Sequence, residues 1–190
     1  MRSQSNTLEN IFKKQGRLTD KLTRHSYIPV YERLFEPLRD CPLSILEIGI
    51  SRGGSILAWE EYFQNALITC IDINPNIFLS KKWIEKVNRS KRIHPILCDI
   101  NDVKKFNREI GSRTFDIVID DGSHKIEDQI SSVKLLFPKL NKNGMLFIED
   151  VEDMKHEAHF VKEYGLEVFD LREEKGRYDD ILFLIKKIVH

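Results

Sequence analysis

Short apolar runs rich in β-branched residues alternate with amphipathic segments along most of the chain. The apolar runs cover residues 44–48, 67–71, 93–97, 115–119 and 145–148. Between these runs, helical periodicity is found near residues 55–63, 80–88, 102–110, 126–140 and 151–164. Strand and helix signals in alternation predict right-handed βαβ units, in which helices cover both faces of a parallel sheet. The pattern therefore predicts an α/β fold.

The pattern changes towards the carboxyl terminus. Residues 167–171 and 181–186 are both strand-like, and we expect the charged segment between them, which contains Gly176, to form a turn without a helix. Two strands joined so closely predict an antiparallel pair added to the parallel sheet. A standard nicotinamide-binding Rossmann domain lacks such an ending.

The first 42 residues differ from the rest of the chain. They carry helical segments near residues 7–15 and 29–38 and end before the first strand. A stretch of this length is too short to form a domain of its own. We therefore divide the chain into an N-terminal helical arm, residues 1–42, and one α/β domain, residues 43–190. We expect the arm to pack over the edge of the sheet as a lid.

Composition excludes several classes of protein. Lys plus Arg and Asp plus Glu each total 30 in 190 residues, and this balance argues against broad nucleic-acid binding. The three cysteines, Cys41, Cys70 and Cys98, form no CxxC pair and are expected to be reduced thiols. The polar amino terminus lacks the apolar stretch of a signal peptide, and no apolar run approaches the roughly 20 residues that cross a bilayer. We expect a cytoplasmic protein.

A glycine-containing loop follows the first predicted strand. Its pattern is Glu47-x-Gly49-x-x-x-Gly53-Gly54, which differs from the GxGxxG of dinucleotide-binding loops. Glycines let the backbone turn sharply and approach a ligand closely. Because the spacing is not that of a pyrophosphate-binding loop, it favours S-adenosylmethionine (SAM). The alternative is a strand–turn–helix corner that needs glycine only for its own geometry.

Acidic residues close the next two strands and extend this candidate cofactor site. Asp72 lies a little over 20 residues beyond Gly49, where an acid in Rossmann-type folds accepts hydrogen bonds from ribose hydroxyls. Asp99 closes the third strand, within reach of an adenine amino group. Each acid taken singly is equally explained as a helix cap or a solvated turn residue. The candidate cofactor-binding residues are Glu47, Gly49, Ser51, Gly53, Gly54, Ser55, Asp72, Ile73, Asp99, Ile100 and Asp120.

Polar side chains also follow the fourth and fifth predicted strands. The fourth runs into Asp120-Asp121-Gly122-Ser123-His124 and the fifth into Glu149-Asp150. Neighbouring parallel strands end at the same edge of a sheet, so we expect Asp121, Glu149 and Asp150 to converge. Carboxylates so close repel one another unless a cation is shared between them. Hard oxygen ligands suit Mg²⁺, with Mn²⁺ or Ca²⁺ as alternatives.

His124 and Asp121 form the candidate catalytic pair. A metal at Asp121 would orient a hydroxyl nucleophile and lower its pKa, and His124 would take the proton. The alternatives are that His124 and the Glu149–Asp150 pair only cap the helices that follow them. Asp120 is also ambiguous, because it could face either the metal or the amino group of SAM.

These segments resemble those of a known family. The chain is similar to the SAM-dependent sugar O-methyltransferases of macrolide and aminocoumarin pathways, such as those for mycinamicin, tylosin and novobiocin, and to cephalosporin-hydroxylase-like proteins. The likeness lies in residues 19–21, 25–27, 31, 37–39, 46–55, 119–124, 148–150 and 177–180. It implies a Rossmann-like class I methyltransferase fold, with a mostly parallel seven-stranded sheet and an antiparallel C-terminal strand. It also implies Asp121, Glu149 and Asp150 as Mg²⁺ ligands and His124 as the base.

The resemblance implies a Mg²⁺-dependent O-methyltransferase acting on a hydroxyl of a sugar, a nucleotide sugar or a glycan. This chain is shorter than the antibiotic enzymes, which leaves the acceptor open, including a small metabolite. His25, Tyr27 and Tyr31 are candidate acceptor-pocket residues, and a homo-oligomer is expected. The rival hypotheses are a hydroxylase-like oxidoreductase, for which no nicotinamide loop is found, and a SAM-binding partner protein without catalysis.

Overall fold

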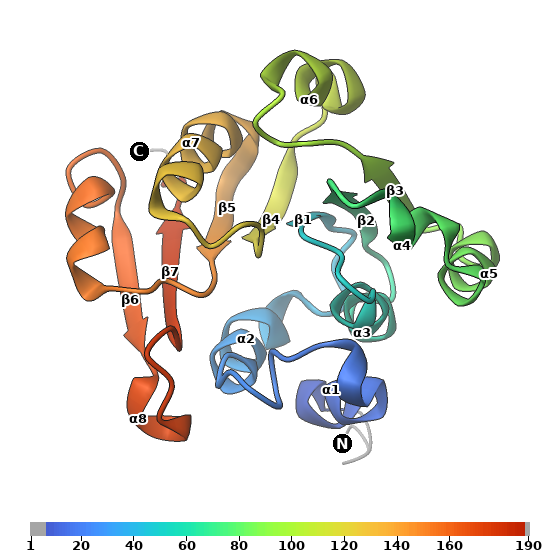
Figure 1. The fold of residues 1–190 in the computed structure, drawn as a ribbon, viewed down its shortest axis with the longest axis horizontal. Helices are drawn as coiled ribbons and strands as arrows, with labels where there is room; N and C mark the ends of the chain where they lie inside the picture. Colours follow the sequence, from blue (N-terminus) through green and yellow to red (C-terminus); the bar gives the residue numbers. More distant parts are fainter. Residues whose placement is uncertain (1–6, 189–190) are drawn as a thin grey trace.

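A seven-stranded sheet forms the centre of the structure (Figure 1). The computed structural model describes residues 7–188 and, for Lys82, the backbone alone; residues 1–6 of the predicted arm lie outside it. The strands are β1 (Ser44–Ile48), β2 (Leu67–Asp72), β3 (Ile93–Leu97), β4 (Phe115–Asp120), β5 (Leu140–Ile148), β6 (Leu166–Asp170) and β7 (Ile181–Lys186). Their order is β3-β2-β1-β4-β5-β7-β6, with β7 antiparallel to both of its neighbours. The mostly parallel sheet with an antiparallel C-terminal strand is therefore confirmed.

Helices cover both faces of the sheet. Figure 1 shows α1 (Leu8–Gln15), α2 (Ile28–Phe35) and α3 (Gly54–Tyr62) below it, and α6 (Val103–Ile110) and α7 (Ile126–Leu136) above it. Successive strand residues point to opposite faces, so Ile45 packs with the lower helices and Leu46 with the upper ones. Two further helices, α4 (Pro75–Leu79) and α5 (Lys81–Arg89), precede β3. No helix within residues 7–188 is both long and apolar enough to span a membrane.

The described part of the predicted arm belongs to the lower layer of the core. Thr7 accepts a hydrogen bond from the backbone of Asn10 at 3.2 Å, which caps α1. Aromatic contacts then join α2 to the centre of the sheet, since the ring of Tyr31 lies 5.0 Å from that of Phe147 in β5. The arm thus lies over a face of the sheet and not at its edge. Its treatment as a segment separate from residues 43–190 stays a prediction.

Two predicted helices are shorter than expected. The helix predicted over residues 126–140 ends at Leu136 because Pro138 follows, and the chain continues as the 3₁₀ turn η4 (Phe137–Lys139) into β5. The helix predicted over residues 151–164 is wrong, since only the 3₁₀ segment η5 (Met154–His159) forms. None of residues 152–159 is buried, so no apolar face stabilises a longer helix.

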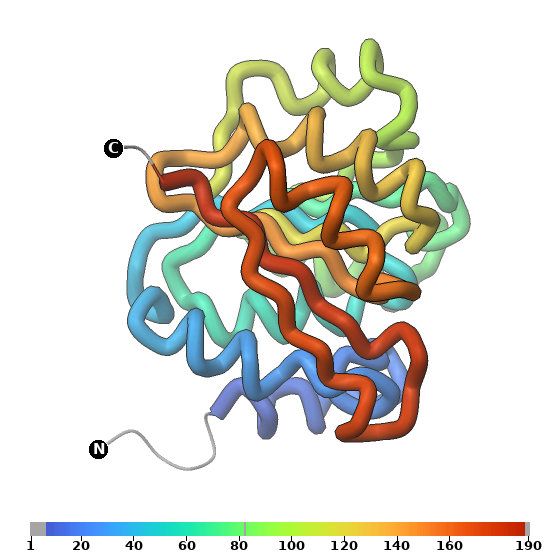
Figure 2. Tube along the Cα trace, turned by 90° about the vertical axis from the view of Figure 1, so that its left-hand side faces the viewer, coloured from blue at the N-terminus to red at the C-terminus, as the bar shows by residue number. Residues whose placement is uncertain are grey.

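The turn before β7 contains a helix that was not expected. Residues 172–180 hold the short α8 (Arg172–Lys175), which ends at Gly176 in the left-handed region. Figure 2 shows this red turn beside the blue N-terminal segment. There, Lys175 Nζ donates to the backbone oxygens of Leu22 and His25, both at 2.5 Å. The C-terminal hairpin therefore supports the loop between α1 and α2.

Gly49 lies where the order of strands reverses, between β1 and β4. Its φ of +91° is in the region that favours glycine, and an added Cβ would lie 1.9 Å from the backbone oxygen of Asp121. This position therefore needs glycine so that the tips of the two central strands can approach each other.

We predict that Gly49→Ala lowers the free energy of unfolding by more than about 3 kcal/mol, because the left-handed strain adds to a backbone collision. Gly176→Ala is the matched control, because Gly176 lies in the left-handed region with a φ of +66° but has open space around it. Its expected cost is about 1 kcal/mol. Urea unfolding of both variants measures the difference, and equal losses would contradict the collision.

Candidate functional site

The carboxyl ends of three neighbouring strands place acids around one buried ammonium. Glu47 lies in β1, Asp121 directly follows β4, and Glu149 directly follows β5. The Nζ atom of Lys21 lies 2.6 Å from Asp121 Oδ2, 2.5 Å from Glu149 Oε2 and 3.5 Å from Glu47 Oε1. Lys21 comes from the loop between α1 and α2 and is only 1% exposed. The structure thus brings these acids together around a residue of the arm.

Burial governs the protonation of this cluster. Burial lowers the pKa of Lys21, but the three surrounding carboxylates outweigh this effect and hold the pKa well above its ordinary value. Burial raises the pKa of both Glu47 and Glu149, and Lys21 opposes that rise. Asp150, next to Glu149, adds a fourth carboxylate, which contacts Tyr27 and His25. The cluster therefore retains an excess of negative charge that a further cation would stabilise.

The three residues expected in the acceptor pocket instead contact the acids. The hydroxyl of Tyr31 donates to Glu149 Oε1 at 2.5 Å, and that of Tyr27 donates to Asp150 Oδ1 at 2.7 Å. His25 stacks on Tyr27 with ring centroids 5.0 Å apart, and its Nδ1 lies 3.2 Å from Asp150 Oδ1. All three are buried, and none lines either cavity described below. Their contact with an acceptor stays a prediction.

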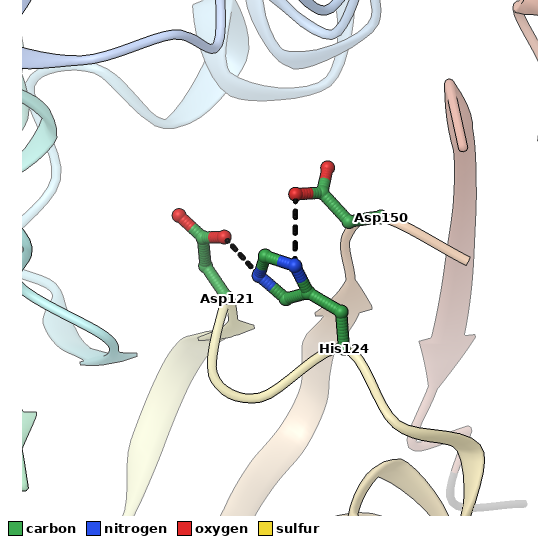
Figure 3. Close-up of side chains that lie close together, drawn as sticks. All are labelled: Asp121, His124 and Asp150. Atoms are coloured by element: carbon green, nitrogen blue, oxygen red, sulfur yellow. Dashed lines mark hydrogen bonds and ion pairs between the residues drawn. The ribbon is translucent and has the colours of Figure 1, made fainter. Parts of the chain in front are cut away.

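His124 lies between two carboxylates, as Figure 3 shows. Its Nε2 is 3.2 Å from Asp121 Oδ1 and its Nδ1 is 3.4 Å from Asp150 Oδ2. One ligand atom from each of the three residues lies within 4.8 Å of the others, so a single ion would fit among them. The two carboxylates are donors that suit Mg²⁺ or Mn²⁺, whereas an imidazole nitrogen is the donor that softer ions such as Zn²⁺ prefer.

Glu149, the third metal ligand expected from the sequence, lies outside this group of three. Its two carboxylate oxygens accept hydrogen bonds from Lys21 and Tyr31. Its direct coordination of a metal therefore stays a prediction.

The neighbouring charges set the protonation of His124. The hydrogen bond to Asp121 raises the pKa of His124 to about 9, and Asp150 adds to the effect, whereas burial opposes it. Burial raises the pKa of Asp150. For Asp121, Lys21 and His124 outweigh burial and hold the pKa below its ordinary value. At neutral pH the imidazole in this arrangement is therefore protonated.

Unusual backbone conformations gather around the same cluster. Among the described residues other than glycine, four have a positive φ, and three of these lie at strand tips: Ser51 (49°), His124 (62°) and Asp150 (55°). Such conformations cost free energy and persist only where the surrounding structure enforces them. Here they direct the side chains of His124 and Asp150 towards Asp121.

A cavity of about 510 Å³ lies beside these strand tips. Most of the candidate cofactor residues line it, namely Gly49, Ser51, Asp72, Ile73, Asp99, Ile100 and Asp120, together with Asp121, His124 and Asp150. Asp72 Oδ2 accepts from the backbone of Ile50 at 2.8 Å and of Ser51 at 3.1 Å, so it also fixes the loop after β1. Asp99 accepts from the backbone of Asn101 at 2.9 Å. Both acids therefore have structural partners, and their binding of a cofactor stays a prediction.

Four of the candidate cofactor residues do not line this cavity. Glu47 is buried and accepts from Trp59 Nε1 and Ser55 Oγ, both at 2.6 Å. Ser55 lines a second cavity, which adjoins this one and is described below. Gly53 packs against the ring of Trp83, and a Cβ on Gly54 would lie 2.5 Å from the backbone of Leu18. The structure therefore explains both of these glycines by packing.

Asp120 lies at the end of β4, where it lines the cavity although it is 5% exposed. Burial raises its pKa to about 6, while a hydrogen bond from Ser132 opposes the rise. Asp120 belongs neither to the group of possible metal ligands nor to the Lys21 cluster. Its position favours a ligand in the cavity over the metal.

Sequence reasoning did not assign a role to Lys21, although the residue lies in a segment that carries the resemblance. Periodicity gives no signal there, because Lys21 belongs to a turn and a lysine is ordinarily exposed. The number of acids at the strand tips was the available signal, since three buried carboxylates require a cation.

We predict that Lys21→Met destabilises the fold by about 3–5 kcal/mol at neutral pH, because buried acids lose their partner. Without the ammonium, the folded-state pKa of Glu47 and Glu149, already raised by burial, rises further above the unfolded value. Such acids oppose folding as the pH rises, so the loss in the free energy of unfolding should be larger near about pH 8 than near about pH 5. Urea unfolding at both values measures it. Lys14→Met is the control, since the exposed pair with Glu61 contributes less than about 1 kcal/mol. A loss independent of pH would contradict burial of the charged acids.

A second prediction concerns His124 in protein freed of metal with EDTA. Because Asp121 is the main cause of its raised pKa, Asp121→Asn should lower the pKa of His124 from about 9 towards the ordinary value near 6.5. An NMR titration of the imidazole measures it. Asp128→Asn, which removes an acid that contacts Ser123 instead, should leave it unchanged. An unaltered pKa in Asp121→Asn would exclude the contact with His124.

The chain matches known proteins along much of its length. Residues 46–151 match a family model described as a methyltransferase domain. The chain is 32% identical over 144 residues to a tetracenomycin-C pathway enzyme of Streptomyces olivaceus, the 8-demethyl-8-alpha-L-rhamnosyl tetracenomycin-C 2'-O-methyltransferase; this covers 70% of this chain and 35% of the relative. It is 35% identical over 136 residues to the demethylmacrocin O-methyltransferase of Streptomyces fradiae, which covers 67% of this chain and 32% of that relative. This chain thus spans about a third of the length of these curated relatives. The likeness to antibiotic sugar O-methyltransferases is confirmed, and the one to cephalosporin-hydroxylase-like proteins stays a prediction.

Solved structures share the fold. The MycE methyltransferase of the mycinamycin pathway, in complex with Mg, SAH and mycinamycin VI, aligns with a TM-score of 0.71 and 24% identity over 98% of this chain and 56% of its own. The SAH-bound methyltransferase PaMTH1 of Podospora anserina aligns with a TM-score of 0.66 and 17% identity, over 97% of this chain and 88% of its own. At such identities the likeness shows the fold alone, and it confirms the predicted Rossmann-like fold. Together with the family model, which covers more than half of the sequence, it shows that this chain belongs to the methyltransferase-domain family.

Proposed function

We propose that this chain is a SAM-dependent O-methyltransferase that methylates a sugar hydroxyl with the help of a divalent cation. The observation that carries the proposal is the convergence of Asp121, His124 and Asp150 at a cavity lined by strand tips, in a chain of the methyltransferase-domain family. The curated relatives, several of which are named for a methylated sugar, support the choice of acceptor.

The cavity of about 510 Å³ would hold SAM, which supplies the methyl group on its sulfonium. Asp72 and Asp99 close neighbouring strands along this cavity. The Asp72 carboxylate accepts from three backbone N–H groups and retains a lone pair that could accept from a ribose hydroxyl. Asp99 lies one strand further on, where it would face the adenine. Asp120 lines the cavity next to Asp121, where its carboxylate would face the amino group of SAM.

Asp121 and Asp150 would hold the cation, with either Glu149, as the resemblance implies, or His124, as the observed geometry allows, as a third ligand. The cation would bind the acceptor hydroxyl and lower its pKa. The residues fit such an ion, because the cluster has more carboxylates than Lys21 can neutralise and the ligand atoms are close enough. We favour Glu149 as the ligand, because His124 is then left to serve as a base.

His124 would take the proton of the hydroxyl as its oxygen attacks the methyl carbon. The new O–CH₃ bond forms as the S–CH₃ bond breaks, and the sulfur leaves with the electron pair as neutral SAH. His124 accepts a proton only when its imidazole is neutral. With the charges of Asp121 and Asp150 compensated by a cation, His124 loses the attractions that raise its pKa and becomes a base near neutral pH.

The test measures transfer from labelled SAM to a panel of sugars, nucleotide sugars and glycans, with Mg²⁺ or with EDTA. We expect turnover that EDTA abolishes, and we expect His124→Ala to lower it by roughly 100-fold or more. The variant should bind SAH as the wild type does, because His124 contributes the base and not the main cofactor contacts. Calorimetry measures that affinity.

A different result would contradict each part of the proposal. Unchanged transfer in His124→Ala would remove this residue from the mechanism. Turnover that persists in EDTA would exclude the metal and leave methyl transfer standing. Binding of SAH without turnover on any acceptor would favour a SAM-binding partner protein.

A further inference from the structure

A second cavity, of about 520 Å³, adjoins the first at Asp121. Asp20, Ser51 and Asp121 line both cavities, so the two share one boundary. One wall of the second cavity is the loop between α1 and α2, and the other is the loop that follows β1. If the first cavity holds SAM, the second is the space from which an acceptor reaches Asp121.

Three arginines line the second cavity: Arg17, Arg24 and Arg52. Arg52 Nη1 donates to the backbone oxygen of Arg17 at 3.3 Å, so the Arg52 side chain lies against the loop that carries Arg17. Within residues 7–188, none of the three guanidinium groups forms an ion pair with a carboxylate. Guanidinium groups gathered without acidic partners attract an anion, with which they form paired hydrogen bonds.

Few acids oppose these arginines. The two acidic residues of the lining are Asp20 and Asp121, and Asp121 is already paired with Lys21 and His124. Asp20 offsets one of the three arginine charges, so two positive charges remain in excess around the cavity. The whole chain has a formal net charge of zero, so this excess is a local feature.

We propose that the second cavity binds an anionic group of the acceptor, a phosphate or a carboxylate attached to the sugar whose hydroxyl lies at Asp121. The inference rests on the proposed function and makes it narrower, because it favours sugar phosphates, nucleotide sugars or uronic acids over neutral sugars. The guanidinium groups bind the anion while the acids at the strand tips hold the reacting hydroxyl. The carboxylate of SAM is the competing anion, and the experiment separates the two.

Calorimetric titrations of the protein saturated with SAH test the proposal, because the cofactor carboxylate is then already present. The probes are inorganic pyrophosphate, glucuronate and neutral glucose at one ionic strength. We expect pyrophosphate or glucuronate to bind and glucose not to bind measurably, and the anion bound more tightly identifies phosphate or carboxylate as the preferred group. Binding should weaken as salt is added.

Arg17→Gln, Arg24→Gln and Arg52→Gln should each weaken anion binding by about tenfold, and the triple variant should abolish it. Arg108→Gln is the matched control, since this exposed arginine lies in α6 on the other face of the sheet and pairs with Glu109 at 3.1 Å. It should leave anion affinity unchanged. Circular dichroism checks that all variants fold.

Three results would overturn the proposal: no anion binds the SAH-loaded protein, the triple variant binds anions as the wild type does, or the triple variant loses SAH instead. The last result would assign the arginines to the cofactor carboxylate. Failure of the wild type to bind SAH would count against the proposed function alone. Titration of the free protein with pyrophosphate would then still test the anion site.

Discussion

The ammonium of Lys21 is the interaction on which the centre of this molecule depends. Glu47, Asp121 and Glu149 come from three adjacent strands, and their carboxylates would not remain buried together without a cation between them. The two central strands, β1 and β4, cannot supply that cation, because they contain no lysine, arginine or histidine. Lys21 comes instead from the N-terminal loop, which α1, α2 and the C-terminal hairpin hold in place. The arm is therefore part of the site as well as of the core.

One lysine is not enough for the acids around it, and this shortage gives the site its chemistry. Tyr31 and Tyr27 donate hydrogen bonds to Glu149 and Asp150, which lowers the cost of burial without adding charge. His124 adds a proton when its pKa is raised to about 9. A base must lose that proton, so catalysis by His124 requires another source of positive charge next to Asp121 and Asp150. The proposed cation and the proposed base thus depend on the same carboxylates.

The sequence predicts the fold well because alternation of strands and helices is a property of long segments. The tips of β4 and β5 were expected to meet, and they do, since neighbouring parallel strands end at one edge. Predictions failed where few residues decide the outcome. The helix expected over residues 151–164 has no buried side chain between residues 152 and 159, and α8 is too short to show a period. Lys21 gave no signal, because its position depends on contacts 100 and 128 residues away. At Gly54 the structure shows a packing reason for glycine, its approach to Leu18, and binding of a cofactor there stays a prediction.

The two cavities divide the proposed reaction between different parts of the chain. The sheet holds the strand tips in fixed positions, so they are suited to the cofactor and to the acids that would act on the reacting atoms. The second cavity is lined by two loops, in which side chains can change without altering the sheet. Asp121 lies at the boundary of both, held by Lys21 on one oxygen and facing His124 with the other. A methyl group bound in one cavity and a hydroxyl presented from the other would meet at this boundary, where Asp121 is the residue that also contacts His124. The charge of the loops, and not that of the strand tips, should therefore select the acceptor.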